Sequence, residues 1–180
     1  MLAATLLLLT ACKEKKTVEA DVIKTDYVAP KPKEPIAIAV GTVTEEVQWM
    51  EGRRYTVTIK GHAVDSLPMV QNANGQQYKD NSIRVEVARA DGSIFFGRTF
   101  TKASFTEWLT SDYREKAILE GINFLGKDGA RLMFIASLNY PDASDDEAVD
   151  LQMALDAQGG IAVKPFTYND RDDLESDSAE

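Results

Sequence analysis

The sequence predicts a mainly β (α+β) domain of about eight antiparallel strands in hairpins, arranged as a sandwich or a small barrel. Three observations support this fold class. Apolar and polar residues alternate along several segments, as in Tyr55-Thr56-Val57-Thr58-Ile59, and a period of two gives a strand one buried and one wet face. Turn sequences separate these segments at hairpin spacing, and only one short stretch has helical character.

The strands are expected in four pairs, each joined by a turn that contains glycine. These turns are Glu51-Gly52, Asp91-Gly92, Lys127-Asp128-Gly129 and Gly159-Gly160. Asp-Gly and Gly-Gly supply the positive φ that tight hairpin turns need. We therefore expect strands near residues 47–51, 53–62, 82–90, 93–101, 118–126, 130–140, 147–156 and 160–166. Leu132-Met133-Phe134-Ile135 is apolar on both faces, which predicts a central or covered strand.

One segment between the fourth and fifth strands breaks the alternation. Ser104 and Glu107 have the spacing of a capping box, and Ser111-Asp112 can begin a second helical turn. The apolar side chains that share one helical face are Phe105, Trp108 and Leu109. One short or broken helix is therefore expected to divide the strands four and four.

Length and composition limit the classes of function. The chain has 180 residues and 19.9 kDa, which suits one domain, and its 44% hydrophobic and 27% charged residues are ordinary for a globular chain. A single Cys and a single His exclude an intramolecular disulfide, a Cys-rich zinc site and a multi-His metal site. A net charge of −9 and a pI of about 4.7 argue against nucleic-acid binding.

The N-terminal segment resembles the signal of bacterial lipoproteins. Residues 2–10 are almost entirely apolar, too short to span a bilayer but as long as the apolar region of a signal peptide. They end in Leu9-Thr10-Ala11-Cys12, which resembles a lipobox, although no Lys or Arg precedes the apolar run. The resemblance implies a signal peptide over residues 1–11 and lipid attachment, such as palmitate, at Cys12. The alternative is a buried N-terminal element with an ordinary Cys.

The residues after Cys12 bear on the membrane in which the protein is anchored. Lys13 stands where some lipoproteins carry the Asp that retains them at the inner membrane. Lys13-Glu14 resembles in part the surface-export signal of Bacteroides-type lipoproteins, which Lys15 interrupts. We therefore expect a cell-envelope protein of a Gram-negative bacterium, lipid-anchored in the outer membrane on its periplasmic or surface face.

The remaining chain divides into a tether, a domain and a tail. Residues 12–46 are charged and contain Pro30, Pro32 and Pro35, so we expect a flexible tether whose apolar residues 36–40 either dock as an edge strand or remain spacer. Residues 47–167 are expected to form a single β-rich domain. Residues 168–180 carry acids against Arg171 alone, which predicts a disordered acidic tail.

Several segments carry a resemblance to a family. They are Asp65-Ser66-Leu67-Pro68, Asn74-Gly75-Gln76-Gln77-Tyr78, Asp91-Gly92-Ser93-Ile94-Phe95-Phe96, Phe100-Thr101-Lys102-Ala103-Ser104-Phe105, Asp112-Tyr113-Arg114 and Ile118-Leu119-Glu120-Gly121. Over most of residues 45–166 the chain resembles the uncharacterised Bacteroides-type lipoprotein family of domain of unknown function 4738. This resemblance implies an envelope lipoprotein and assigns no catalytic residue.

Four groups of residues are candidate sites. His62, Asp65 and Ser66 have the residue types of a nucleophilic triad, but three residues in one loop rarely reach its geometry, and a strand-end His beside a turn is favoured. Asn72-Ala73-Asn74-Gly75 reads first as a turn. A third group of acids could bind calcium, but a solvated loop is the favoured interpretation. These acids are Asp142, Asp145, Asp146, Glu147 and Asp150. A fourth group of aromatic residues could line a ligand cavity, but packing in the core is the favoured interpretation. These residues are Phe95, Phe96, Phe100, Phe105 and Trp108.

These patterns favour a lipid-anchored envelope protein with a β-rich binding or interaction domain. An envelope protein, a glycan or a small apolar ligand are the candidate partners, besides the membrane itself, and no catalytic residue, metal or cofactor is indicated. The alternative is a periplasmic enzyme or enzyme inhibitor whose site is assembled from the loops at residues 63–80 and 141–147.

Overall fold

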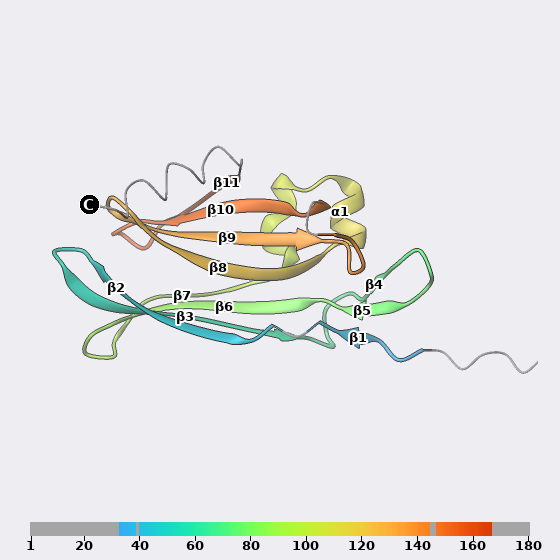
Figure 1. The fold of residues 1–180 in the computed structure, drawn as a ribbon, viewed down its shortest axis with the longest axis horizontal. Coiled ribbons are helices and arrows are strands. Elements are labelled where there is room, and N and C mark those ends of the chain that lie inside the picture. The colour runs from blue at the N-terminus through green and yellow to red at the C-terminus, as the bar shows by residue number, and fades with distance from the viewer. Residues whose placement is uncertain (1–32, 39, 145–146, 167–180) are drawn as a thin grey trace, which may run out of the picture. The chain divides into compact units, whose positions relative to one another are not determined.

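Two four-stranded antiparallel sheets face each other and enclose an apolar core (Figure 1). The computed structural model describes residues 33–38, 40–144 and 147–166, which lie in the unit Lys33–Glu180. The mainly β prediction is confirmed, and the sandwich is the correct one of the two predicted architectures, since neither sheet closes into a barrel.

Each sheet is built from strands that follow one another in the chain. The first sheet has the order β2-β3-β6-β7, with β2 (Thr42–Trp49), β3 (Arg53–Ala63), β6 (Asn81–Arg89) and β7 (Ile94–Phe100). The second has the order β11-β10-β9-β8, with β8 (Ile118–Asp128), β9 (Arg131–Asn139), β10 (Val149–Leu155) and β11 (Ile161–Pro165). These are the eight predicted strands in their four predicted hairpins, and the doubly apolar β9 is central, as expected.

A third, small sheet lies where the chain passes from β3 to β6. Its order is β1-β5-β4, with β1 (Ile36–Ala37), β5 (Gln77–Lys79) and β4 (Val70–Gln71). β4 and β5 were not predicted, because strands of two or three residues have too few positions to show alternation. β1 pairs with β5 in parallel, so the apolar segment after Pro35 docks as an edge strand, which was one of the two expectations.

The prediction that the tether runs to residue 46 and that the first strand begins at residue 47 was wrong. Thr42 to Glu46 already belong to β2 and pair with the β3 residues Lys60 to Thr56. Most of the side chains in this part of β2 are exposed, so the polar pattern hid the strand. The predicted signal peptide, Cys12 and the acidic tail lie outside the described residues.

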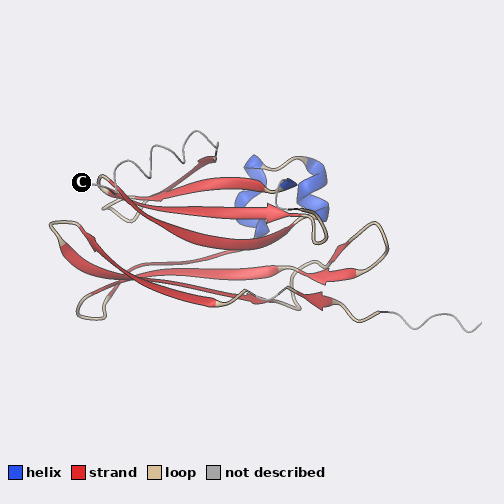
Figure 2. Cartoon of the chain, viewed as in Figure 1, coloured by secondary structure: helices blue, strands red, loops and turns tan. Residues whose placement is uncertain are grey.

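Two short helices join β7 to β8, as one of the predicted alternatives stated. They are the 3-10 helix η1 (Lys102–Trp108) and the α-helix α1 (Ser111–Lys116), drawn blue in Figure 2. The predicted cap at Ser104 was wrong, because η1 begins at Lys102. The hydroxyl of Ser104 instead accepts a hydrogen bond from the Thr101 N–H at 3.2 Å. Thr110 caps α1, with its side chain accepting from the N–H of Tyr113.

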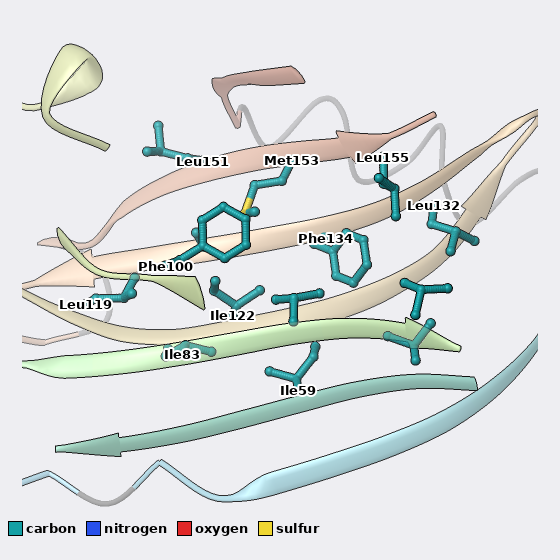
Figure 3. Packing of buried hydrophobic residues seen from close by; sticks show 14 of the residues in the cluster. Ile59, Ile83, Phe100, Leu119, Ile122, Leu132, Phe134, Leu151, Met153 and Leu155 are labelled. Atoms are coloured by element: carbon teal, nitrogen blue, oxygen red, sulfur yellow. The ribbon is translucent and has the colours of Figure 1, made fainter. Parts of the chain in front are cut away.

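The space between the two large sheets is filled by side chains from their facing surfaces (Figure 3). β8 comes closest to the first sheet, near β6, β3 and β2. Phe105 of η1 is fully buried and stacks on Phe100 of β7, with ring centroids 5.9 Å apart. η1 therefore contributes to the core rather than lying only on its surface.

The five aromatic residues that were candidates for a ligand cavity all pack into or against this core. Phe95 and Phe96 are adjacent on β7, and adjacent residues of a regular strand face opposite sides of the sheet. The register of β7 against β6 shifts between Val87 and Ala88, so both rings contact the core. Phe95 meets the rings of Trp49 and Tyr55 edge to face, at 5.3 and 6.1 Å. These rings therefore pack the core and do not line an interior ligand cavity in the described residues.

Candidate functional site

A surface pocket of about 450 Å³ lies where three segments distant in the sequence come together. One wall is the turn between β4 and β5, at residues 71–74, and another is the connection from β9 to β10, at residues 140–143 and 147. Asp112 and Lys116 of α1 complete it. A volume of this size lies within the range of small-molecule sites.

The β4–β5 wall is shaped by Asn72. Its side-chain oxygen accepts hydrogen bonds from the N–H groups of Asn74 at 3.0 Å and Gln76 at 2.8 Å, which is the usual role of Asn in a turn. Gly75 supplies the positive φ of 77° that closes the turn. The Asn72 amide donates to Asp142 across the pocket, so the turn is attached to the opposite wall.

Asp142 is the carboxylate at which two walls meet. It accepts hydrogen bonds from the hydroxyl of Tyr78 on β5 and from the amide of Asn72. These two donors, with Tyr78 the stronger, lower the pKa of Asp142 below its ordinary value. Asp142 therefore stays ionised at neutral pH and presents its remaining lone pairs to the pocket.

A second carboxylate, Asp112, is fixed on the α1 side. Lys116 lies one helical turn away with its Nζ 2.6 Å from Asp112, and the hydroxyl of Tyr140 donates to the same carboxylate. Lys116 first, and then Tyr140, lower the pKa of Asp112. The hydrogen bond to Asp112 and, less strongly, burial raise the pKa of Tyr140 to about 12. Tyr140 thus remains a protonated donor whose ring orientation is fixed.

The ring of Tyr140 also packs against a second aromatic ring, that of Tyr113. Its centroid lies 4.6 Å from that of Tyr113, and the Tyr113 hydroxyl donates to the backbone carbonyl of Glu147. The pocket therefore combines a fixed aromatic ring with two ionised carboxylates that have spare acceptor capacity. Such a surface accepts hydrogen bonds from a donor-rich ligand while an aromatic ring contacts its apolar face.

The two loops that the sequence analysis singled out, at residues 63–80 and 141–147, do meet in this pocket. The triad candidates within the first loop are not assembled. His62 is exposed near the end of β3, opposite Ser82. Asp65 forms an exposed ion pair with Lys79 at 2.7 Å, and Ser66 is exposed. In the described chain, no hydrogen bond joins these three side chains.

The acids that were candidates for calcium do not form one cluster, although Asp142 and Glu147 both line the pocket. Asp150 lies on β10 and accepts a hydrogen bond of 2.6 Å from Ser137 of β9, whereas Asp142 is engaged with Tyr78 and Asn72. Asp145 and Asp146 lie outside the described residues. Among the residues that are described, no three His, Cys, Asp or Glu side chains gather as a metal site would require.

Sequence reasoning missed the tyrosines and α1 residues of the pocket. Asp112 and Lys116 have the i,i+4 spacing of a helical ion pair, so the sequence did hold a signal for their contact. Tyr78 and Tyr140 gave none, because their partners are far away in the chain.

A buried charge pair connects β5 and β6 with the start of β8. Asp80 is 3% exposed, and one of its oxygens accepts from the N–H groups of Asn81 at 2.8 Å and Leu119 at 3.0 Å. Its other oxygen lies 3.7 Å from Nζ of Lys102, which also donates to the carbonyl of Ala117 at 2.6 Å. This cluster holds the β5–β6 connection against the segment that follows α1.

Neither helix in the described part of the chain has the length and apolar character needed to cross a bilayer. Comparison with curated proteins gives no match. The family model described as Domain of unknown function (DUF4738) matches residues 21–163, which covers all three sheets up to the last strand. The chain therefore belongs to the DUF4738 family.

Proposed function

We propose that this protein is a lipoprotein of the Gram-negative cell envelope whose β-sandwich domain binds a glycan in the pocket between α1 and the β4–β5 turn. The observation that carries the binding proposal is the fixed arrangement of Tyr140, Asp112 and Asp142 around a pocket of about 450 Å³. The anchoring proposal is supported by Leu9-Thr10-Ala11-Cys12 after an apolar run.

The pocket chemistry favours a sugar over a small apolar ligand. Sugar hydroxyls donate hydrogen bonds, and ionised carboxylates accept them more strongly than neutral groups do. Because Asp112 and Asp142 already have their protein partners, they need no rearrangement to accept further bonds. The half-buried ring of Tyr140 offers an apolar face to the C–H side of a pyranose.

The first described residues of the chain, just before β1, lie close to this pocket. Glu34, just before β1, accepts a hydrogen bond of 2.9 Å through its carbonyl from the side chain of Gln76, and Gln76 lies in the β4–β5 turn. About 20 residues separate Cys12 from β1 in the sequence. Each buried CH₂ of an acyl chain contributes about 0.8 kcal/mol, so several chains at Cys12 would anchor the domain near the envelope surface.

Glycan binding is tested on an array of bacterial envelope polysaccharide fragments, followed by calorimetry on each hit. Asp112→Asn is expected to weaken binding about tenfold, since one charge-assisted hydrogen bond is lost. Asp128→Asn, at the exposed end of β8, is the matched control and should bind like the parent chain. Absence of any hit, or equal affinity for Asp112→Asn and the parent, would contradict the glycan proposal.

Acylation is tested separately with Cys12→Ser. Cells supplied with a clickable palmitate analogue are expected to label the parent chain and not the variant, because serine lacks the thiol that carries the lipid. Lys16→Ala, four residues further along, is the control and should label normally. Labelling of Cys12→Ser at the parent level would rule out lipid attachment at this residue.

A further inference from the structure

A second hollow, of about 270 Å³, lies at the end of the first sheet where the β2–β3 and β6–β7 turns occur. In Figure 1 these two turns lie at the end of the sheet away from the β4–β5 turn. Three arginines line it, Arg53, Arg54 and Arg89, together with Tyr55, Ala90 and Asp91.

The sheet register explains why Arg53 and Arg89 converge. Tyr55 of β3 is the direct partner of Arg89 on β6, and Arg53 stands two residues before Tyr55 on the same strand. Side chains two apart on one strand, and directly opposed on neighbouring strands, lie on the same face of the sheet. The Arg53 and Arg89 side chains therefore lie on the same face of the sheet as Tyr55, which is almost completely buried and packs against Trp49 and Phe95.

Arg89 is already held in place. Its Nη1 donates to the hydroxyl of Ser93 at 3.2 Å and to the carbonyl of Ile94 at 3.3 Å, and its guanidinium carbon lies 5.2 Å from the centre of the Phe95 ring. Both hydrogen bonds use Nη1, so within the described residues the donors on Nε and Nη2 remain uncommitted. A held guanidinium with spare donors binds an anion at little further cost in side-chain entropy.

Three acids, Glu46, Glu51 and Asp91, lie beside the three arginines, and the ion pairs of Arg53 and Arg54 are exposed. Glu51 lies 2.8 Å from Arg53, but both side chains are largely exposed, and Glu46 is 3.7 Å from Arg54. Exposed pairs of this kind contribute little and exchange easily for a better acceptor. Asp91, the acid that lines the hollow itself, uses Oδ1 to accept from the N–H of Ser93 at 2.9 Å and its hydroxyl at 2.7 Å. The hydrogen bonds from Ser93 and, less strongly, the positive charge of Arg89 lower the pKa of Asp91, so a bound phosphate competes with Asp91 for Arg89.

We propose that this hollow binds a phosphate group, with Arg89 as the fixed ligand and Arg53, on the same face of the sheet, as the side chain that closes on it. The guanidinium fork matches two phosphate oxygens at once, and charge-assisted pairs of this geometry are among the strongest polar contacts. The phosphate can belong to a soluble molecule or to a lipid headgroup. The site is separate from the glycan pocket and does not depend on it.

The first test is a titration of the full-length chain with inorganic phosphate, followed by NMR of the arginine Nε–H signals. We expect saturable shifts at Arg89 and Arg53, and an affinity about tenfold weaker in Arg89→Gln and in Arg53→Gln. Arg84→Gln is the matched control, because Arg84 lies on β6 but pairs with Glu86, at 3.1 Å. Shifts that do not saturate, or equal weakening in Arg84→Gln, would overturn the proposal.

A second arm distinguishes the two sources of phosphate. Cys12→Ser and Cys12→Ser/Arg89→Gln are compared for binding to phosphatidylcholine vesicles with and without phosphatidic acid. A loss of the phosphatidic acid-dependent binding in the double variant assigns the site to a headgroup. Equal vesicle binding, together with the phosphate titration above, assigns it to a soluble phosphate compound.

Discussion

Asp80→Asn is expected to lower the free energy of unfolding by about 3 kcal/mol. Asp80 is 3% exposed, and the substitution keeps its shape while removing the negative charge that faces Lys102. The Lys102 side chain is only 13% exposed, so its ammonium would be left with the carbonyl of Ala117 as its partner among the described residues. Urea denaturation of the two chains measures the difference.

The pH dependence of this loss identifies its cause. Burial lowers the pKa of Lys102, and Asp80 opposes that lowering, so the pKa falls further in Asp80→Asn. The pKa of this lysine is then lower in the folded chain than in the unfolded chain. At a pH between these two pKa values, the unfolded chain binds more protons than the folded chain. Stability therefore rises with pH in that interval. We expect the deficit of the variant to shrink as pH approaches the ordinary lysine pKa of about 10.4.

The matched control for Asp80→Asn is Asp65→Asn, which removes the same charge from an exposed ion pair. Asp65 lies 2.7 Å from Lys79, but its side chain is 81% exposed. Solvent screening makes such pairs weak, so its loss in stability should be far smaller. Equal losses in the two variants would show that burial of the Asp80–Lys102 pair does not matter.

Phe134→Ala is expected to destabilise the domain by about 3–5 kcal/mol. Phe134 is fully buried on β9, opposite Phe124 of β8 and Met153 of β10, and its ring points into the space between the sheets (Figure 3). Removing the ring takes away buried apolar surface and leaves a cavity that the two rigid sheets cannot close. Chemical denaturation should show a lower midpoint with an unchanged dependence on denaturant.

Leu125→Ala tests whether that loss comes from the core. Leu125 lies on the neighbouring strand β8 but is 39% exposed, at a point where the register against β9 shifts. Because little buried surface is removed there, we expect only a small change in stability. If Phe134→Ala lowered the free energy of unfolding no more than Leu125→Ala does, the result would contradict a core packed between the two sheets.

The large strands could be predicted because each has enough residues to show alternation and is bounded by a glycine turn. β3 and β6 were placed within a residue or two of their true ends. β2 was predicted too short because Thr42 to Glu46 contain one apolar residue, Val43, and all five side chains are exposed, so the segment shows no alternation of buried and exposed residues. The choice between sandwich and barrel depends on pairing at the outer edges, which is a long-range property that one sequence does not show.

The candidate sites were harder to predict than the fold. The loops that contain Asn72 and Asp142 were predicted as parts of an alternative site, and the structure brings them together. Tyr140 and Arg89 carried no signal, because each gains its role from a residue placed by tertiary contacts. Side chains whose partners are distant in the chain can be recognised only after the sheets are assembled.

The most direct test of the proposed anchoring is mass spectrometry of the N-terminal peptide from protein extracted from native membranes. We predict a mature chain that begins at Cys12 and carries the mass of a diacylglycerol and an acyl chain. A chain that still begins at Met1, without any acyl mass and recovered from the soluble fraction, would contradict the proposal that this domain is held at the envelope by lipid.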